Sequence, residues 1–113
     1  MYEVIFYETS DGRKPVSEFL DSLDPKMRAK LIGLMELLEE KGASLREPYS
    51  APLGDGLFEL RCKLGSNITR VLFFFYIGKR IIVTNGFTKK TQKTPTSEIK
   101  LAKARRQDWL TRH

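Results

Sequence analysis

The sequence has very little of the residue types that most often carry catalytic or metal chemistry. It contains one cysteine, Cys62, and one histidine, His113, which is the last residue. A single cysteine cannot form an internal disulfide, and a terminal histidine sits where chains usually fray. These absences argue against a disulfide framework and against Ser-His-Asp or Cys-His catalysis. Since no His, Cys, Asp or Glu cluster has metal-ligand spacing, we expect no metal and no cofactor.

Long hydrophobic runs are also missing. The longest apolar run, residues 71–77, has the length of a strand and falls well short of the roughly 20 residues that a membrane span needs. The N-terminal residues lack the basic start and the long apolar stretch of a signal peptide. We therefore expect a cytoplasmic protein with no membrane contact.

Acidic residues are scarce in the last third of the chain. Residues 1–78 carry 10 Lys/Arg and 12 Asp/Glu, whereas residues 79–113 carry 10 Lys/Arg and only Glu98 and Asp108. This concentration of positive charge favours a polyanionic partner, either nucleic acid or an acidic protein segment. The alternative is a solvated charged face without a partner.

The first half of the chain predicts one strand and two helices. Residues 2–7 are rich in strand-forming side chains, and Pro15 opens a short helix. Asp24 and Pro25 form a helix start, and Gly42 ends this second helix. We therefore expect an N-terminal αα-hairpin.

The second half predicts an ordered loop, three strands and a last helix. Prolines and glycines mark residues 44–56 as the loop, and tight turns separate strands at 57–64, 68–76 and 80–88. Such short connections favour antiparallel hairpins. With a helix beginning near Ser97, residues 1–113 are expected to form a single α+β domain whose small antiparallel sheet also takes in the N-terminal strand.

Two arginines stand out within these strands. Arg61 lies on the polar face of its strand beside Lys63, and Arg70 interrupts an otherwise apolar strand. An arginine is costly to bury unless it is paired. Two interpretations stay open. Either Arg70 pairs with Glu59 across the hairpin, or Arg61 and Arg70 together form a phosphate-binding patch on an open sheet face.

The loop after the third of these strands is basic. Lys89, Lys90 and Lys93 lie within five residues, with Thr91 between them. Lysine and threonine both donate hydrogen bonds to phosphate, and the N-terminus of the following helix adds partial positive charge. The alternative is a solvated basic turn.

Four sequence blocks in this part of the chain carry a family resemblance. They are Gly-Leu-Phe-Glu-Leu-Arg at 56–61, Arg-Val-Leu at 70–72, the stretch 85–95, and Glu98-Ile99 followed by Ala102 and Arg105. In this order they resemble the phage-derived branch of the RelE/HigB-like toxins of type II toxin–antitoxin systems, over residues 2–109. The resemblance implies a RelE-like fold and a ribosome-dependent mRNA endoribonuclease. It also implies a cognate antitoxin of the helix-turn-helix or ribbon-helix-helix type.

The implied chemistry is metal-free RNA cleavage by the substrate's own 2′-hydroxyl, which needs a base, an acid and positive charge at the phosphorus. Arg61 and Arg70 are predicted to stabilise that charge, and Lys89 and Lys90 complete the predicted catalytic set, one of them as acid or base. Further RNA contacts are predicted for Lys63, Lys93, Thr91, Lys79, Arg80 and Tyr76. For Tyr76 the alternative to an RNA contact is simple packing against the sheet.

Two other functions fit the same sequence. One is an RNA- or ribosome-binding protein that blocks translation without cutting. The other is a phage-derived protein-binding module whose basic loop docks onto an acidic protein. Both alternatives use the same basic surface as the nuclease. Only the nuclease would produce new ends in mRNA.

Overall fold

A computed structural model describes residues 1–89 and 93–113. The α+β class, the αα-hairpin and the C-terminal helix are confirmed. The elements run in the order β1 (Glu3–Phe6), α1 (Pro15–Ser22), α2 (Pro25–Lys41), the short 3-10 helix η1 (Gly42–Ser44), β2 (Ser50–Gly54), β3 (Leu57–Leu64), β4 (Asn67–Tyr76), β5 (Arg80–Lys89) and α3 (Thr96–Arg112).

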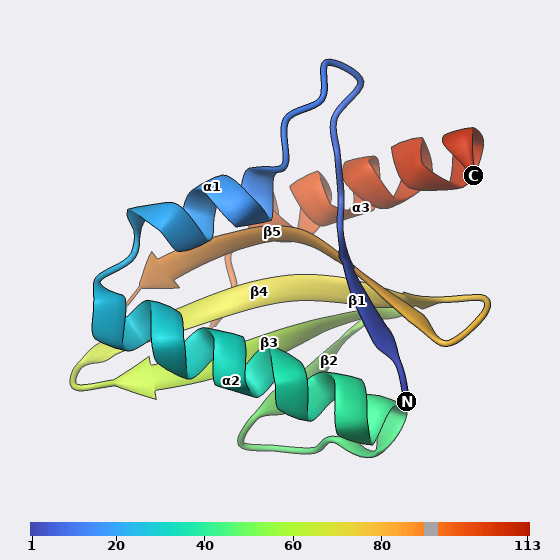
Figure 1. Cartoon of the computed structure of the whole chain (residues 1–113). Coiled ribbons are helices and arrows are strands. Elements are labelled where there is room, and N and C mark those ends of the chain that lie inside the picture. Colours follow the sequence, from blue (N-terminus) through green and yellow to red (C-terminus); the bar gives the residue numbers. More distant parts are fainter. Residues whose placement is uncertain (90–92) are drawn as a thin grey trace.

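The described residues form one five-stranded sheet in the order β1-β5-β4-β3-β2 (Figure 1). The pairs β2–β3, β3–β4 and β4–β5 are antiparallel. The short turns between β3, β4 and β5 predict this for the last two pairs. The N-terminal strand joins the same sheet, also as expected, but it lies parallel to β5. The sheet is therefore mixed, with its first strand held beside its last.

The prediction of a loop over residues 44–56 is wrong for Ser50–Gly54, which forms β2. This strand lies at the edge of the sheet and pairs only with β3. Pro52 is tolerated there because an edge strand does not need every backbone N–H for pairing. The register of β2 against β3 shifts between Pro52 and Gly54. This irregularity coincides with the proline and glycine that made the segment resemble a turn in the sequence.

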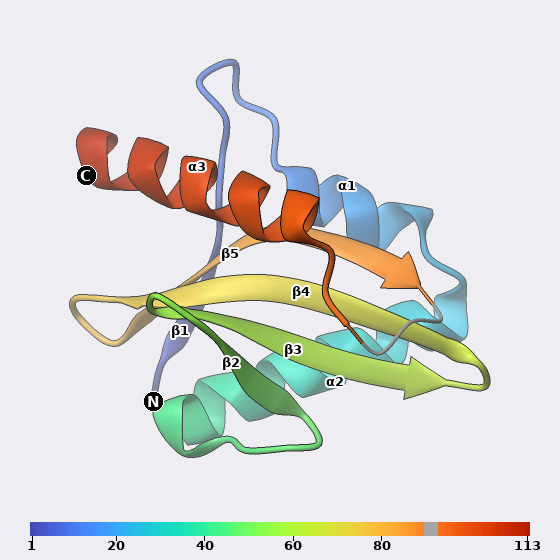
Figure 2. The ribbon, with the colours of Figure 1, turned by 180° about the vertical axis from the view of Figure 1, so that it is seen from behind.

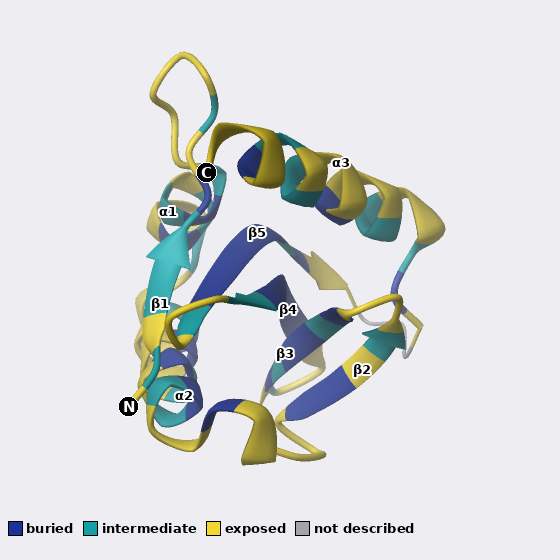
Figure 3. Ribbon diagram, turned by 90° about the vertical axis from the view of Figure 1, so that its right-hand side faces the viewer, coloured by how far each residue is buried: buried dark blue, intermediate teal, exposed yellow. Residues whose placement is uncertain are grey.

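Helices cover both faces of the sheet. Figures 1 and 2 show α1 and α2 on one face and α3 on the other, and the view in Figure 3 shows buried strands between these two layers. Along β3, Leu60 and Cys62 join the core under α1 and α2, whereas Leu57 joins the core under α3. None of the helices in the described ranges combines the length and apolarity needed to cross a membrane.

The ends of α2 follow the signals in the sequence. The Asp24 side chain accepts a hydrogen bond from the backbone N–H of Lys26 at 3.1 Å, and Pro25 is the first helical residue. At the other end Gly42 has a φ of +56°, which favours glycine. A β-carbon on Gly42 would also collide with the ring of Tyr2. This glycine therefore lets the end of α2 pack against the start of the chain.

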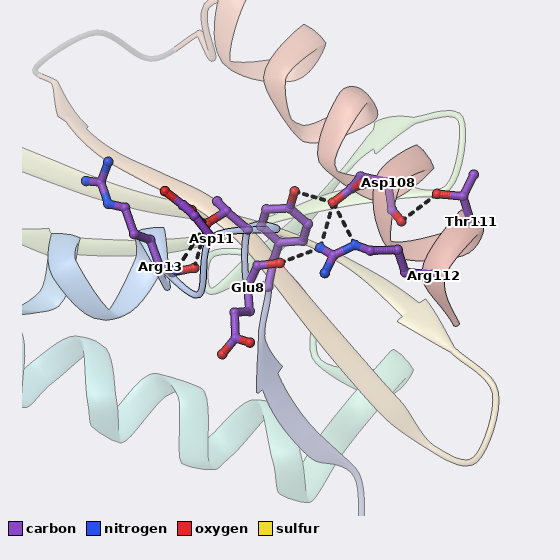
Figure 4. Close-up of polar contacts among 8 residues, drawn as sticks. Glu8, Asp11, Arg13, Asp108, Thr111 and Arg112 are labelled. Carbon is purple, nitrogen blue, oxygen red and sulfur yellow. Dashed lines mark hydrogen bonds and ion pairs between the residues drawn. The ribbon is translucent and has the colours of Figure 1, made fainter.

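A polar cluster joins α3 to the segment after β1 (Figure 4). The Tyr7 hydroxyl donates to Asp108 Oδ2 at 2.6 Å, and Arg112 donates to the same oxygen through Nε and Nη2. Arg112 also donates to the carbonyl oxygen of Glu8. The hydrogen bond from Tyr7, followed by that from Arg112, lowers the pKa of the Asp108 carboxyl. The cluster ties two segments about a hundred residues apart in the sequence.

We expect Gly42→Ala to lower the free energy of unfolding by about 1–3 kcal/mol, because alanine is strained at positive φ and its methyl group meets Tyr2. Gly33 provides the matched control, since a β-carbon there meets no other atom on the exposed side of α2. Gly33→Ala should raise stability by about 0.5–1 kcal/mol. Urea denaturation followed by circular dichroism measures both, and effects of the same sign would contradict this account.

Asp108 should contribute a pH-dependent part of the stability. Its pKa is lower in the folded chain than the ordinary value of 3.8. The stabilisation is therefore fully present above that value and is lost as the pH falls through the folded pKa. We expect Asp108→Asn to lower the urea midpoint at pH 7 and the difference from wild type to shrink steadily below pH 3.8. A difference of constant size across this range would refute the assignment.

Candidate functional site

Strand pairing places the two predicted arginines directly opposite each other. Arg61 on β3 pairs with Arg70 on β4, and Glu59 pairs with Leu72 two positions along. Residues two apart on a strand share a face, so Glu59, Arg61 and Arg70 lie on the face that also carries α3. The Arg61 side chain is 33% exposed and that of Arg70 is 1% exposed. One guanidinium therefore reaches the surface and the other lies beneath it.

A buried carboxylate holds the two arginines together. Glu59 Oε2 lies 2.5 Å from Arg61 Nε and 3.7 Å from Arg70 Nε, and the Glu59 side chain is 1% exposed. Burying charges is costly unless opposite charges and hydrogen bonds compensate. One carboxylate facing two guanidinium groups meets that need and leaves net positive charge. Arg70 therefore pairs with Glu59, as one of the two interpretations of the sequence predicts, and it also lies opposite Arg61.

Thr94, two residues before α3, covers this group. The hydroxyl of Thr94, itself buried, donates a hydrogen bond to Glu59 Oε1. In Figure 2 the chain leading into α3 passes in front of β4. The guanidinium of Arg70 also lies 5.8 Å from the centre of the Phe87 ring on β5. The sheet face predicted to be open is therefore closed at Arg70, and the accessible part of the site begins at Arg61.

Lysines extend the positive charge beyond Arg61. Lys63 and Lys89 both pair with Ile68, from opposite sides of β4, and both are exposed. With strands spaced about 4.8 Å apart, the two lysine backbones are only about 10 Å apart. Lys93 is also exposed, whereas Lys90 and Thr91 lie outside the described residues. We define the cationic end as Glu59, Arg61, Lys63, Arg70 and Lys89.

The remaining predicted RNA contacts lie elsewhere. Tyr76 pairs with Arg80 at the far end of the β4–β5 hairpin, eight positions along β4 from Ile68, which is roughly 27 Å for extended backbone. Tyr76 packs edge-on against Trp109 with ring centres 5.7 Å apart, and the Arg80 guanidinium lies 4.7 Å above the Tyr76 ring. Lys79 occupies the adjoining turn. These three residues form a separate surface, and their contact with RNA stays a prediction.

The cationic end can bind and polarise a phosphate. A guanidinium presents paired N–H donors that match two phosphate oxygens, and fixed positive charge stabilises a pentacoordinate phosphorus. Apart from its bond to Glu59, the Arg61 side chain has one other ion pair among the described residues. Its Nη1 lies 3.5 Å from Oε1 of the exposed Glu47. Within residues 1–89 and 93–113, no group of three or more His, Cys, Asp or Glu side chains could hold a metal ion.

The sequence did not predict the roles of Glu59 and Thr94 at this site. Glu59 was predicted only as a partner of Arg70, although it also bonds Arg61 and so organises the whole group. Its position two residues before Arg61 on one strand face is a signal that could have identified it. Thr94 gave no such signal, because its hydrogen bond spans 35 residues of sequence.

Comparison with known families gives a match. The model of the family described as Phage derived protein Gp49-like (DUF891) matches residues 18–107, well over half of the chain. The matched range includes Glu59, Arg61, Arg70 and Thr94. A search of curated proteins finds no match.

We expect Glu59→Gln to lower the free energy of unfolding by about 3 kcal/mol, because it removes the carboxylate charge from beside a buried arginine. Glu47→Gln is the matched control, since Glu47 is 69% exposed and meets only the rim of the same group. It should change stability by less than about 0.5 kcal/mol. Equal losses in urea denaturation of the two variants would show that Glu59 is not the central charge.

Proposed function

The chain belongs to the Gp49-like family of phage-derived proteins, which is associated with toxin–antitoxin pairs, and we propose that it is the toxin of such a pair, an endoribonuclease that cuts translated mRNA. The observation that carries the proposal is the cationic end. There a buried carboxylate orders two arginines on neighbouring strands, and one guanidinium reaches the surface beside lysines. The sequence blocks that resemble RelE/HigB-like toxins include these same residues.

The reaction proposed is attack of a ribose 2′-oxygen on the adjacent phosphorus. The O2′–P bond forms, the P–O5′ bond breaks, and a 2′,3′-cyclic phosphate remains. The 2′-hydroxyl proton passes to a base, and a proton is delivered to the leaving 5′-oxygen. We assign one of these transfers to Lys89 or Lys90, acting as acid or base.

Arg61 and Arg70 have different parts in this scheme. Arg61 is the phosphate ligand, because its Nη groups lie toward the surface while its Nε is held by Glu59. A phosphate oxygen would replace the exposed Glu47 carboxylate at Nη1, at little energetic cost. Arg70 is buried and acts through Glu59 and through its own positive field. It is therefore a positioning residue.

Partners supply what the site itself lacks. The ribosome orients mRNA, and holding the reacting groups in place can replace a large share of the acid–base assistance that a histidine would give. A cognate antitoxin of the helix-turn-helix or ribbon-helix-helix type would inhibit the toxin by covering the cationic end. An acidic or phosphate-mimicking surface is the chemistry that complements Arg61 and its neighbouring lysines.

Expression from a tightly controlled promoter tests the proposal. New 5′ ends should appear on a translated reporter mRNA and not on an untranslated copy. Arg61→Ala should lower cleavage about 100-fold, as expected for removal of a group that stabilises transition-state charge. Arg13→Ala is the control, because Arg13 is 67% exposed and pairs only with Glu18 among the described contacts. It should cleave like wild type.

Other outcomes separate the alternatives. Growth arrest without new ends would contradict the nuclease and support a translation inhibitor that binds without cutting. Neither arrest nor new ends, from folded and abundant protein, would contradict the toxin assignment. Equal cleavage by Arg61→Ala and Arg13→Ala would place the active site elsewhere.

A further inference from the structure

A cavity of about 270 Å³ opens next to Arg61. It is lined by residues of α2, of the turn before β2, and of the β3–β4 hairpin. Arg61 therefore borders two features at once, the cationic end and this cavity. The residues that line the cavity include Lys30, Leu34, Tyr49, Arg61, Lys63 and Ile68.

The cavity exists because β2 is shorter than β3. Strand β2 starts at Ser50, which pairs with Leu60, while β3 continues to Leu64. The last link is the backbone N–H of Arg61, which donates to the Tyr49 carbonyl at 2.8 Å. The preceding chain then turns away, with Tyr49 N–H bonded to the Arg46 carbonyl at 3.0 Å. The end of β3 is left with space beside it.

On the other side of this space, α2 comes close to the end of β3. The ammonium group of Lys30 donates a hydrogen bond to the Lys63 carbonyl. This contact joins the helix to the strand just beyond Arg61. The cavity is thus bounded by a backbone hydrogen bond on one side and by a hydrogen bond from a lysine side chain on the other.

The cavity walls combine apolar, aromatic and cationic side chains. Leu34 and Ile68 supply apolar surface, and Tyr49 is 46% exposed, whereas the other tyrosines are buried or half-buried. Three cations, Lys30, Arg61 and Lys63, lie around the same space. An exposed aromatic ring beside fixed cations is the combination that binds a nucleotide, because the base stacks while the phosphate meets positive charge.

We propose that this cavity is a nucleobase subsite, in which one unpaired RNA base stacks on Tyr49 while its neighbouring phosphate meets Arg61. The inference rests on the proposed function and adds to it a substrate preference. The RNA must be single-stranded at this position, since a paired base cannot turn into the cavity. Tyr49 binds the base, and Arg61 links this subsite to the cationic end.

Binding of a 2′-O-methyl RNA hexamer tests the subsite without cleavage, because the attacking hydroxyl is blocked. The same hexamer without bases measures the phosphate contribution alone. Tyr49→Ala should weaken binding of the intact hexamer about tenfold, in line with loss of base stacking. Its effect on the abasic hexamer should be less than about twofold, because no stacked base is lost there. Tyr49→Phe keeps the ring and should bind like wild type.

Two further variants serve as references. Leu110→Ala removes a half-exposed apolar side chain on α3, remote from the cavity, and should leave binding unchanged. Arg61→Ala should weaken both hexamers to the same extent, because it removes a phosphate contact.

The outcomes separate this inference from the proposed function. Unchanged binding of the intact hexamer by Tyr49→Ala, or equal weakening of both hexamers, would overturn the nucleobase subsite. The second result would indicate a general anion site, as for an acidic protein segment. Wild-type protein that binds neither hexamer would also overturn the subsite, even if it cuts translated mRNA. Base-dependent binding without cleavage of translated mRNA would support the subsite and overturn the nuclease.

Discussion

The burial of the Glu59 carboxylate between Arg61 and Arg70 is the interaction on which the site depends. None of these charges could be buried alone at acceptable cost. Together they compensate one another, and Thr94 satisfies the second carboxylate oxygen. The group joins β3, β4 and the segment entering α3, so the position of the surface guanidinium is determined by the core of the sheet.

Arg61 lies at the boundary between that buried group and the surface. Its Nε is held by Glu59, its backbone holds the turn at Tyr49, and its side chain borders the adjoining cavity. A residue held by these two hydrogen bonds loses little further freedom when a ligand binds, which is how a small domain can preorganise a phosphate contact. Lys63 and Lys89 are exposed and contribute mainly long-range attraction.

The sequence predicted what is determined locally and missed what is determined at a distance. Asp24, Pro25 and Gly42 give the limits of α2 because capping acts within a turn. The tight turn after Leu64 brings Arg61 opposite Arg70, so strand alternation alone placed them together. Strand β2 was not predicted, because Pro52 and Gly54 are residues typical of loops. The contacts of Thr94 with Glu59 and of β1 with β5 join residues far apart in sequence, and no local pattern reports them.

The parallel pairing of β1 with β5 sets an order of assembly during synthesis. Val4 pairs with Ile81, so the first strand leaves the ribosome long before its partner strand exists. The β3–β4 hairpin, whose contacts are local, can form in that interval and already brings Arg61 and Arg70 together. Thr94 and α3 follow later still. A nascent chain therefore acquires its arginine pair together with Glu59 first, and Thr94 and α3, which cover them, only when translation of this domain is nearly finished.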